Sequence, residues 1–163
     1  MSGLKARLVK PTGLEFYDLA IAINTAIWNF VKFEFKNKAA KDAGDKRKDS
    51  EKTVSAIPTR YWQTHAVPLV EAGREMVHEI TLANSSFPII TEDDLRSRLQ
   101  HQQNAIGQNA WIATLIRLTL NDIPSIDANK AETILALTKQ ENKLLRAWKS
   151  ASKRQNKAPE GAE

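Results

Sequence analysis

In two long stretches of this chain, mostly apolar side chains recur alternately four and three positions apart, and each such series is called a seam here. This spacing confines both stretches to helices that pack in a bundle. An α-helix has about 3.6 residues per turn, so this spacing collects the seam on one face. Each such face needs a partner helix to cover it, which predicts an all-α fold. The first seam contains Trp62, Ala66, Leu69, Gly73, Met76, Ile80 and Ala83. The second contains Leu95, Leu99, Gln102, Ile106, Asn109, Ala113, Ile116 and Leu120.

The rest of the sequence supplies two further helices and the connections. Short proline-containing segments separate the last three helices, and short connections join antiparallel neighbours. The sequence therefore predicts an antiparallel up-down four-helix bundle. Pro68 lies inside the second helix and is expected to kink or delay it. The predicted helices cover about 14–38, 59–84, 92–121 and 126–154, with a charged loop at 39–57.

Composition limits the class of protein. Hydrophobic residues make up 42% of the 163 residues, enough to bury the core of one domain at 1–157, followed by a flexible tail at 158–163. The absence of cysteine excludes disulfides and thiolate metal sites. No apolar run approaches the roughly 18 residues that span a bilayer, and the N-terminal residues lack the apolar stretch of a signal peptide. We therefore expect a cytoplasmic protein with no membrane contact.

The sequence offers no catalytic constellation. His78-Glu79 begins like the helix of a zinc protease, but Leu82 stands where the second histidine is required. Glu92-Asp93-Asp94 follows Thr91, and acids in the first turn of a helix are explained by the helix dipole. We therefore expect a protein that is not an enzyme and that has no cofactor or metal.

Four residues of the predicted seams have more than one explanation. A buried amide without a partner costs about 1–3 kcal/mol, so Gln102 and Asn109 either pair across a subunit contact or face solvent on a rotated helix. Gly73 either lets two helices approach closely or merely loosens its helix. Trp148 is expected to fill the bundle or a subunit contact, with a base-stacking platform as the alternative.

Positive charge is concentrated on the last helix. The chain has a formal net charge of +5, yet residues 11–35 and 61–135 hold no excess of Lys and Arg over Asp and Glu. Over residues 139–157 a single acid, Glu141, accompanies seven cations. A helix that packs by one face and presents cations on the others favours a polyanionic partner. The seven are Lys139, Lys143, Arg146, Lys149, Lys153, Arg154 and Lys157.

Four segments, in their order and spacing, are similar to one known family. They are Leu82-Ala-Asn-Ser-Ser-Phe-Pro88, Asp94-Leu-Arg-Ser-Arg-Leu-Gln-His-Gln-Gln-Asn-Ala-Ile-Gly107, Pro124-Ser-Ile-Asp127 and Leu144-Leu-Arg-Ala-Trp-Lys-Ser150. They resemble the accessory variability determinant (Avd) proteins of diversity-generating retroelements, over about residues 61–154 and more weakly 14–29. The segment 37–56 is longer and more charged than the first connection of that family.

The resemblance implies a non-catalytic scaffold. Such proteins are typically basic homopentameric barrels of four-helix bundles that bind a retroelement reverse transcriptase and its structured template RNA. They support the synthesis of mutagenised cDNA. The charge pattern does not distinguish RNA from DNA or an RNA–DNA hybrid. The expected contacts to nucleic acid or polymerase are Arg96, Arg98, Lys143, Arg146, Lys149, Lys153 and Arg154.

Two other functions fit the same sequence. A helical adaptor that binds only protein would use the Gln-rich third helix as its contact surface. A small helical subunit of an RNA-guided defence complex would be equally basic and non-catalytic, and it would stack along a guide instead of closing a ring.

Overall fold

A computed structural model describes residues 15–37, 57, 60–85, 89 and 91–157. Regular structure within these ranges is entirely helical. The N-terminal residues to 14, most of the predicted loop at 39–57 and the predicted tail at 158–163 lie outside the described residues. The elements are α2 (Glu15–Val31), η1 (Lys32–Asn37), η2 (Trp62–Ala66), α5 (Val67–Ser85), α6 (Glu92–Asp122) and α7 (Ala128–Lys157).

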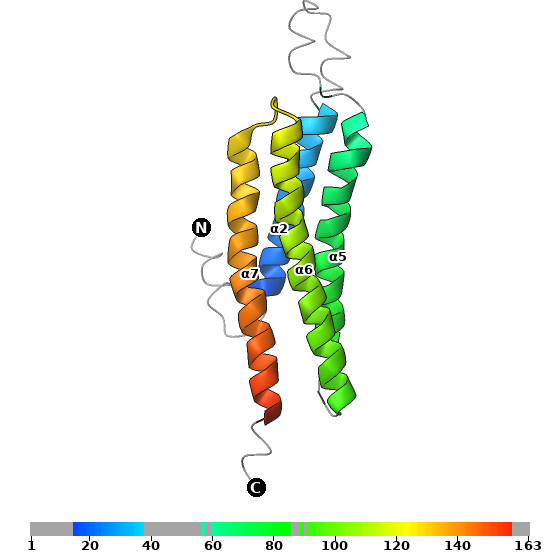
Figure 1. Ribbon diagram of the computed structural model, residues 1–163, viewed down its shortest axis with the longest axis vertical. Helices are drawn as coiled ribbons and strands as arrows, with labels where there is room; N and C mark the ends of the chain where they lie inside the picture. The colour runs from blue at the N-terminus through cyan, green and yellow to red at the C-terminus, as the bar shows by residue number, and fades with distance from the viewer. Residues whose placement is uncertain (1–14, 38–56, 58–59, 86–88, 90, 158–163) are drawn as a thin grey trace, which may run out of the picture.

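The helices form an up-down bundle. Figure 1 shows that α2 and α6 run in one direction along the long axis and that α5 and α7 return in the other. The extensive contacts are between α2 and α5, α5 and α6, α6 and α7, and α7 and α2. This order places α2 diagonally opposite α6, with α6 toward the viewer and α2 behind it. The edge between α5 and α6 therefore lies opposite the edge between α2 and α7.

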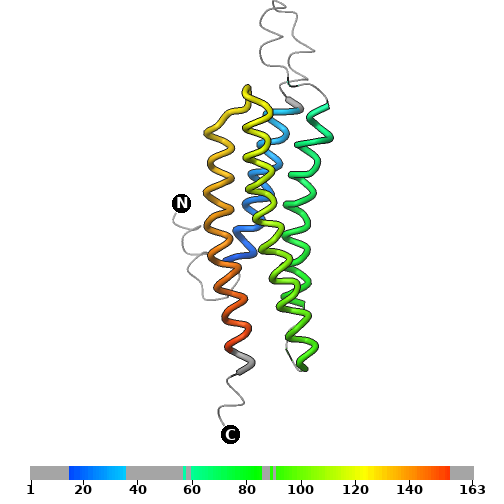
Figure 2. The backbone as a smooth tube through the Cα atoms, in the orientation of Figure 1, coloured from blue at the N-terminus to red at the C-terminus, as the bar shows by residue number. Residues whose placement is uncertain are grey.

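The predicted helical-bundle class is confirmed for the described residues. The observed helix ends lie within three residues of the predicted ones. The tube in Figure 2 follows α6 and α7 as the two longest continuous helices, joined by the short connection after Asp122. Thr91 caps α6 as expected: its Oγ1 accepts from the Asp94 amide, and the Asp94 carboxylate accepts from the Thr91 amide.

As predicted, Pro68 delays the second α-helix, because α5 begins only at Val67, after a π-helical turn at Trp62–Ala66. A proline has no amide hydrogen, so in an α-helix the carbonyl of Thr64 would lose its bond from position 68. The backbone at Trp62–Ala66 is instead a π-helix, in which the amide of Val67 donates to the carbonyl of Trp62. A π-turn of this kind is a known way to accommodate a residue that interrupts the α-helical ladder.

Most predicted seam residues are buried in the core. Ala66, Leu69, Met76, Ile80 and Ala83 are each fully buried on the second helix. The first turns of α6 differ from the prediction, because Leu95 and Leu99 are half-buried while Arg98 is buried.

Gly73 lies where side chains of α2 come close to the backbone of α5. The Asn24 side chain of α2 donates through Nδ2 to the Gly73 carbonyl at 2.6 Å and to the Ala20 carbonyl at 3.1 Å. A Cβ at position 73 would lie 3.0 Å from Asn24 Oδ1 and 3.2 Å from Ile27 Cδ1. The glycine is therefore part of the bundle seam, and the close-approach explanation is confirmed.

Alanine substitution is expected to act oppositely at the two glycines within α5 and α6. Gly73→Ala displaces Asn24 and weakens its bond between helices, which we expect to lower the free energy of unfolding by about 1–2 kcal/mol. Gly107 is exposed, and nothing lies within 4 Å of a Cβ at that position. Gly107→Ala is therefore expected to raise the free energy of unfolding by about 0.5–1 kcal/mol. Urea unfolding of both variants measures the difference, and equal stabilisation by both would contradict the role of Gly73.

Candidate nucleic-acid interface

A strip of cationic side chains follows the outer surface of α7. Five of the six described members are exposed, and Lys149 is half-buried. The first five recur three or four positions apart and the sixth follows the fifth directly, so all six lie on one side of the helix. The six, which we call the α7 cation strip, are Lys139, Lys143, Arg146, Lys149, Lys153 and Arg154.

The α7 cation strip is not neutralised by neighbouring acids. None of its members forms an ion pair with another described residue. The bonds they make go to neutral amides: Lys149 Nζ donates to Gln103 Oε1 at 2.6 Å, and Arg146 Nε donates to Asn142 Oδ1 at 3.0 Å. Partial burial lowers the pKa of Lys149, and the positive charges of Lys153 and Arg146 lower it further. Crowded like charges favour an anionic partner.

A groove between α6 and α7 extends the basic surface. It has a volume of about 580 Å³, and three cationic side chains, Arg117, Lys139 and Arg146, line it. Its other lining residues are neutral and include Thr114 and Asn142. Sequence analysis missed Arg117 because it lies on α6, apart from the basic run. Its position one turn before the C-terminal end of α6, beside the start of an antiparallel α7, was the available signal.

Glu141 does not lie on the cationic surface, contrary to the prediction that it is the single acid among the seven cations. Its side chain is completely buried, and neither carboxylate oxygen has a hydrogen-bond partner among the described residues. Burial raises its pKa to about 8. The sequence did contain a signal, because Thr138, Glu141 and Leu145 continue the three-and-four spacing of the α7 core. At neutral pH this carboxyl is protonated and does not offset the strip.

Arg98 is not available to a phosphate, and we withdraw it from the predicted contacts. Only 7% of the residue is exposed. Its Nε donates to Ser152 Oγ at 3.2 Å, and its guanidinium lies 5.4 Å from the ring centre of Trp148. Trp148 in turn stacks on Phe16, with ring centres 4.0 Å apart. Trp148 is thus part of the bundle seam, and its ring contacts Phe16 and Arg98 of the same chain.

Arg96 remains exposed near the start of α6. Its side chain is 79% exposed and approaches Asp93 at 3.4 Å, an i,i+3 pair on the surface. Exposed pairs of this kind contribute little and exchange readily for another anion. Arg96 is therefore accessible, but it is not a member of the α7 cation strip.

The two seam amides bond within the chain, and neither predicted explanation holds. Gln102 is completely buried and donates through Nε2 to Ser152 Oγ at 2.9 Å. Asn109 is 2% exposed and donates through Nδ2 to the Thr138 carbonyl at 2.7 Å. Both bonds join α6 to α7, so these amides fix the register of the pair that presents the basic surface.

The described residues hold no cluster suited to a metal ion. No group of three or more His, Asp or Glu side chains comes together among them. His101 Nδ1 lies 2.6 Å from Glu79 Oε2, which also accepts from Asn104 Nδ2 at 3.3 Å, so this histidine joins α6 to α5. His78 is exposed on α5. None of the helices in the described ranges combines the length and apolarity that crossing a bilayer requires.

Comparisons with protein-family models, curated proteins and solved structures find no match to this chain. The resemblance to Avd proteins therefore stays a prediction.

Proposed function

We propose that this protein is a non-catalytic scaffold that binds nucleic acid through the α7 cation strip and the adjoining α6–α7 groove. The observation that carries the proposal is that six cations share one side of a helix without an ion pair among the described residues. Such an arrangement places like charges close together; burial, and after it the charges of Lys153 and Arg146, lowers the pKa of Lys149. A phosphate backbone relieves the repulsion between these charges.

The dimensions of the strip suit a phosphate backbone. Residues 139–154 extend over roughly 22 Å at about 1.5 Å per residue. One strand of a duplex carries a phosphate about every 3.4 Å of helix axis, so the strip follows several phosphates in succession. Lysine and arginine ammonium and guanidinium groups contact phosphates without reading the bases, so we expect affinity with little sequence preference from this surface.

The resemblance to Avd proteins suggests the biological setting. We propose that the nucleic acid is the structured template RNA of a retroelement and that the protein partner is its reverse transcriptase. In that role the scaffold supports mutagenic cDNA synthesis in the cytoplasm as a homopentamer. A pentamer of the 18.3 kDa chain would weigh five times that mass, about 92 kDa.

Charge reversal tests the proposed contact. We expect Lys149→Glu, Lys153→Glu and Arg154→Glu together to reduce RNA affinity by at least about 100-fold, because three phosphate contacts become repulsive. The melting temperature should not fall, since the three side chains lie outside the hydrophobic core. Fluorescence anisotropy with a structured RNA at fixed salt measures the affinity.

A matched control removes positive charge elsewhere. The double variant Arg60→Glu and Arg74→Glu changes two exposed cations on the N-terminal part of the second helix, and we expect it to change RNA affinity by less than about threefold. For the wild type, log Kd should rise linearly with log salt concentration. If the triple variant bound RNA with wild-type affinity, the assignment of the RNA-binding site to α7 would be wrong. If the wild type did not bind RNA, the protein-binding adaptor would be favoured.

A further inference from the structure

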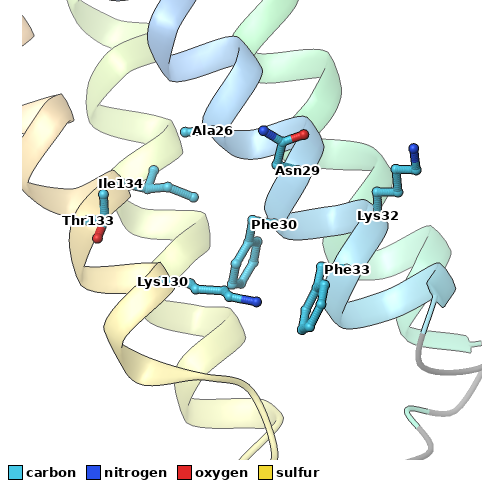
Figure 3. A pocket seen from close by; sticks show the side chains of 8 residues that line it. All are labelled: Ala26, Asn29, Phe30, Lys32, Phe33, Lys130, Thr133 and Ile134. Carbon is cyan, nitrogen blue, oxygen red and sulfur yellow. The ribbon is translucent and has the colours of Figure 1, made fainter. Parts of the chain in front are cut away.

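The α6–α7 groove differs from the hollows at two other, mutually opposite edges of the bundle in how its charged side chains are used. Figure 3 shows the α2–α7 hollow, which has a volume of about 480 Å³. Its Lys130 ammonium lies 3.1 Å from the centre of the Phe33 ring and 3.8 Å from Glu34 Oε1, so this cation is already paired within the chain. The α5–α6 hollow, of about 510 Å³, contains the carboxylates of Glu71 and Glu75. In both hollows carboxylates offset at least part of the positive charge.

The α6–α7 groove has three cations and no carboxylate among its lining residues. The side chains of Arg117 and Lys139 form no ion pair or hydrogen bond with another described residue. Arg146 Nε donates to Asn142 Oδ1 at 3.0 Å, and this neutral amide also lines the groove. The bond orients the Arg146 guanidinium beside the groove and leaves its charge uncompensated. This edge of the bundle is therefore the one prepared for an anion.

The rest of the groove lining is neutral, and much of it consists of small side chains. Asn109 is buried and donates through Nδ2 to the Thr138 carbonyl at 2.7 Å, but its Oδ1 has no hydrogen-bond partner among the described residues. A buried oxygen without a donor is unfavourable, so the groove lacks a donor as well as an anion. The apolar part of the lining consists of Ala110, Ala113, Leu135 and Ala136.

We propose that the α6–α7 groove holds unpaired nucleotides of the strand whose phosphates lie along the α7 cation strip. Lys139 and Arg146 belong both to the strip and to the groove lining, so a strand bound to them has its sugars and bases beside the groove. The groove volume of about 580 Å³ falls within the range of about 300–1,000 Å³ that is usual for sites of small ligands. This inference rests on the proposed function and specifies which form of nucleic acid the site prefers.

Each part of an unpaired nucleotide has a counterpart in the groove. Phosphate meets the three cations, and the flat faces of a base contact the alanine side chains and stack on planar guanidinium groups such as those of Arg117 and Arg146. A base amino group or a ribose hydroxyl is the kind of donor that Asn109 Oδ1 lacks.

A base-paired duplex does not match the groove in this way. Its bases are stacked inside and its phosphates lie outside, so a duplex contacts the strip but leaves the groove empty. A base enters the groove only after it has been unpaired and unstacked, which costs free energy. Unpaired bases avoid this cost. The groove therefore gives the protein a preference for unpaired RNA, whereas the strip binds both forms.

Two changes alter the groove without touching the strip. Arg117→Glu reverses a groove cation, and the double variant Ala110→Leu with Ala136→Leu fills the groove at two exposed positions without changing charge. We expect each to weaken binding of an unpaired RNA of about 12 nucleotides by about tenfold. Binding of a blunt RNA duplex of the same length should change by less than about threefold. Fluorescence anisotropy of the full-length protein at fixed salt measures both affinities, and melting curves show that each variant is folded.

Lys143→Glu is the matched control for these variants. Lys143 is an exposed member of the α7 cation strip but does not line the groove. Its reversal should therefore weaken binding of the unpaired RNA and of the duplex by the same factor.

A strand without bases tests whether the groove receives bases or only phosphates. We expect the wild type and the groove-filling double variant to bind an abasic oligonucleotide of the same length with equal affinity, because nothing enters the groove. If filling the groove weakened the abasic strand as much as the unpaired RNA, the groove would be a phosphate site and the inference would be overturned.

The same measurements separate this inference from the proposed function. Equal affinity of the wild type for unpaired RNA and duplex, lost equally in Lys143→Glu, overturns the groove assignment while the α7 site stands. A preference for unpaired RNA that persists in the groove-filling variant also overturns it. If the wild type binds neither RNA, the proposed function fails and the inference fails with it.

Discussion

Raising the pH from about 5 to about 9 is expected to lower the free energy of unfolding by about 3–5 kcal/mol through Glu141 alone. Burial raises the pKa of this carboxyl from 4.5 to about 8. Between these values the folded protein holds a proton that the unfolded chain has released. Increasing pH therefore favours the unfolded state throughout this window, and the effect ends once the folded carboxyl also ionises.

A matched substitution isolates this effect from other titrating groups. Glu141→Gln keeps the size of the side chain but has no proton to lose. The difference in unfolding free energy between the variant and the wild type should therefore grow in favour of the variant as pH rises from about 5 to about 9. Glu132→Gln is the control on the same helix, because Glu132 is exposed and its difference should stay constant. Chemical denaturation at several pH values measures both, and a constant difference for Glu141→Gln would show that the carboxyl is solvated.

Replacing Trp148 with alanine is expected to cost about 2–3 kcal/mol of stability, somewhat below the range for a completely buried tryptophan because this one is partly exposed. The substitution removes the ring that stacks on Phe16 and lies beside the Arg98 guanidinium. Arg98 is then left near the core with Ser152 as its described hydrogen-bond partner. The lost packing of the ring and the poorly compensated charge of Arg98 both lower stability, because a buried cation without adequate partners is unfavourable.

Trp28→Ala provides the comparison for Trp148→Ala. Trp28 is 48% exposed, so its loss should change stability by less than about 1 kcal/mol. Thermal or urea unfolding measures both variants. If Trp148→Ala kept wild-type stability but lost RNA affinity, the base-stacking role would replace the seam role. We expect instead that Trp148→Ala lowers stability, and that the RNA affinity of the folded variant depends on the neighbouring lysines.

The two predictions concern the same helix as the proposed nucleic-acid site. The inner side of α7 contains Glu141 and Trp148, and its outer side contains the α7 cation strip. Gln102 and Asn109 bond to this helix from α6, so the register of the α6–α7 pair sets the shape of the groove that Arg117, Lys139 and Arg146 line. Substitutions that weaken the packing of the inner side of α7 are therefore expected to alter the groove and the α7 cation strip as well.

Sequence periodicity predicted most of the fold because helix geometry is local. Side chains four and three positions apart must share a face, so the seam of Leu69, Met76 and Ile80 followed from spacing alone. The concentration of cations on the last helix also followed from sequence. The burial of the first turns of α6 did not: Arg98, a predicted contact to nucleic acid, is buried, and Leu95 is only half-buried.

The sequence by itself determined the helical class, the approximate helix bounds and the basic character of the last helix. Only the tertiary structure decided which polar side chains lie inside. Arg98, Gln102 and Glu141 are buried because their partner helices cover them, and that coverage depends on contacts between residues far apart in the chain. The same holds for the α6–α7 groove and for the two opposite hollows, since each forms only where two helices meet. Spacing along one helix specifies a face, but the neighbouring helix determines whether that face is core, groove or surface.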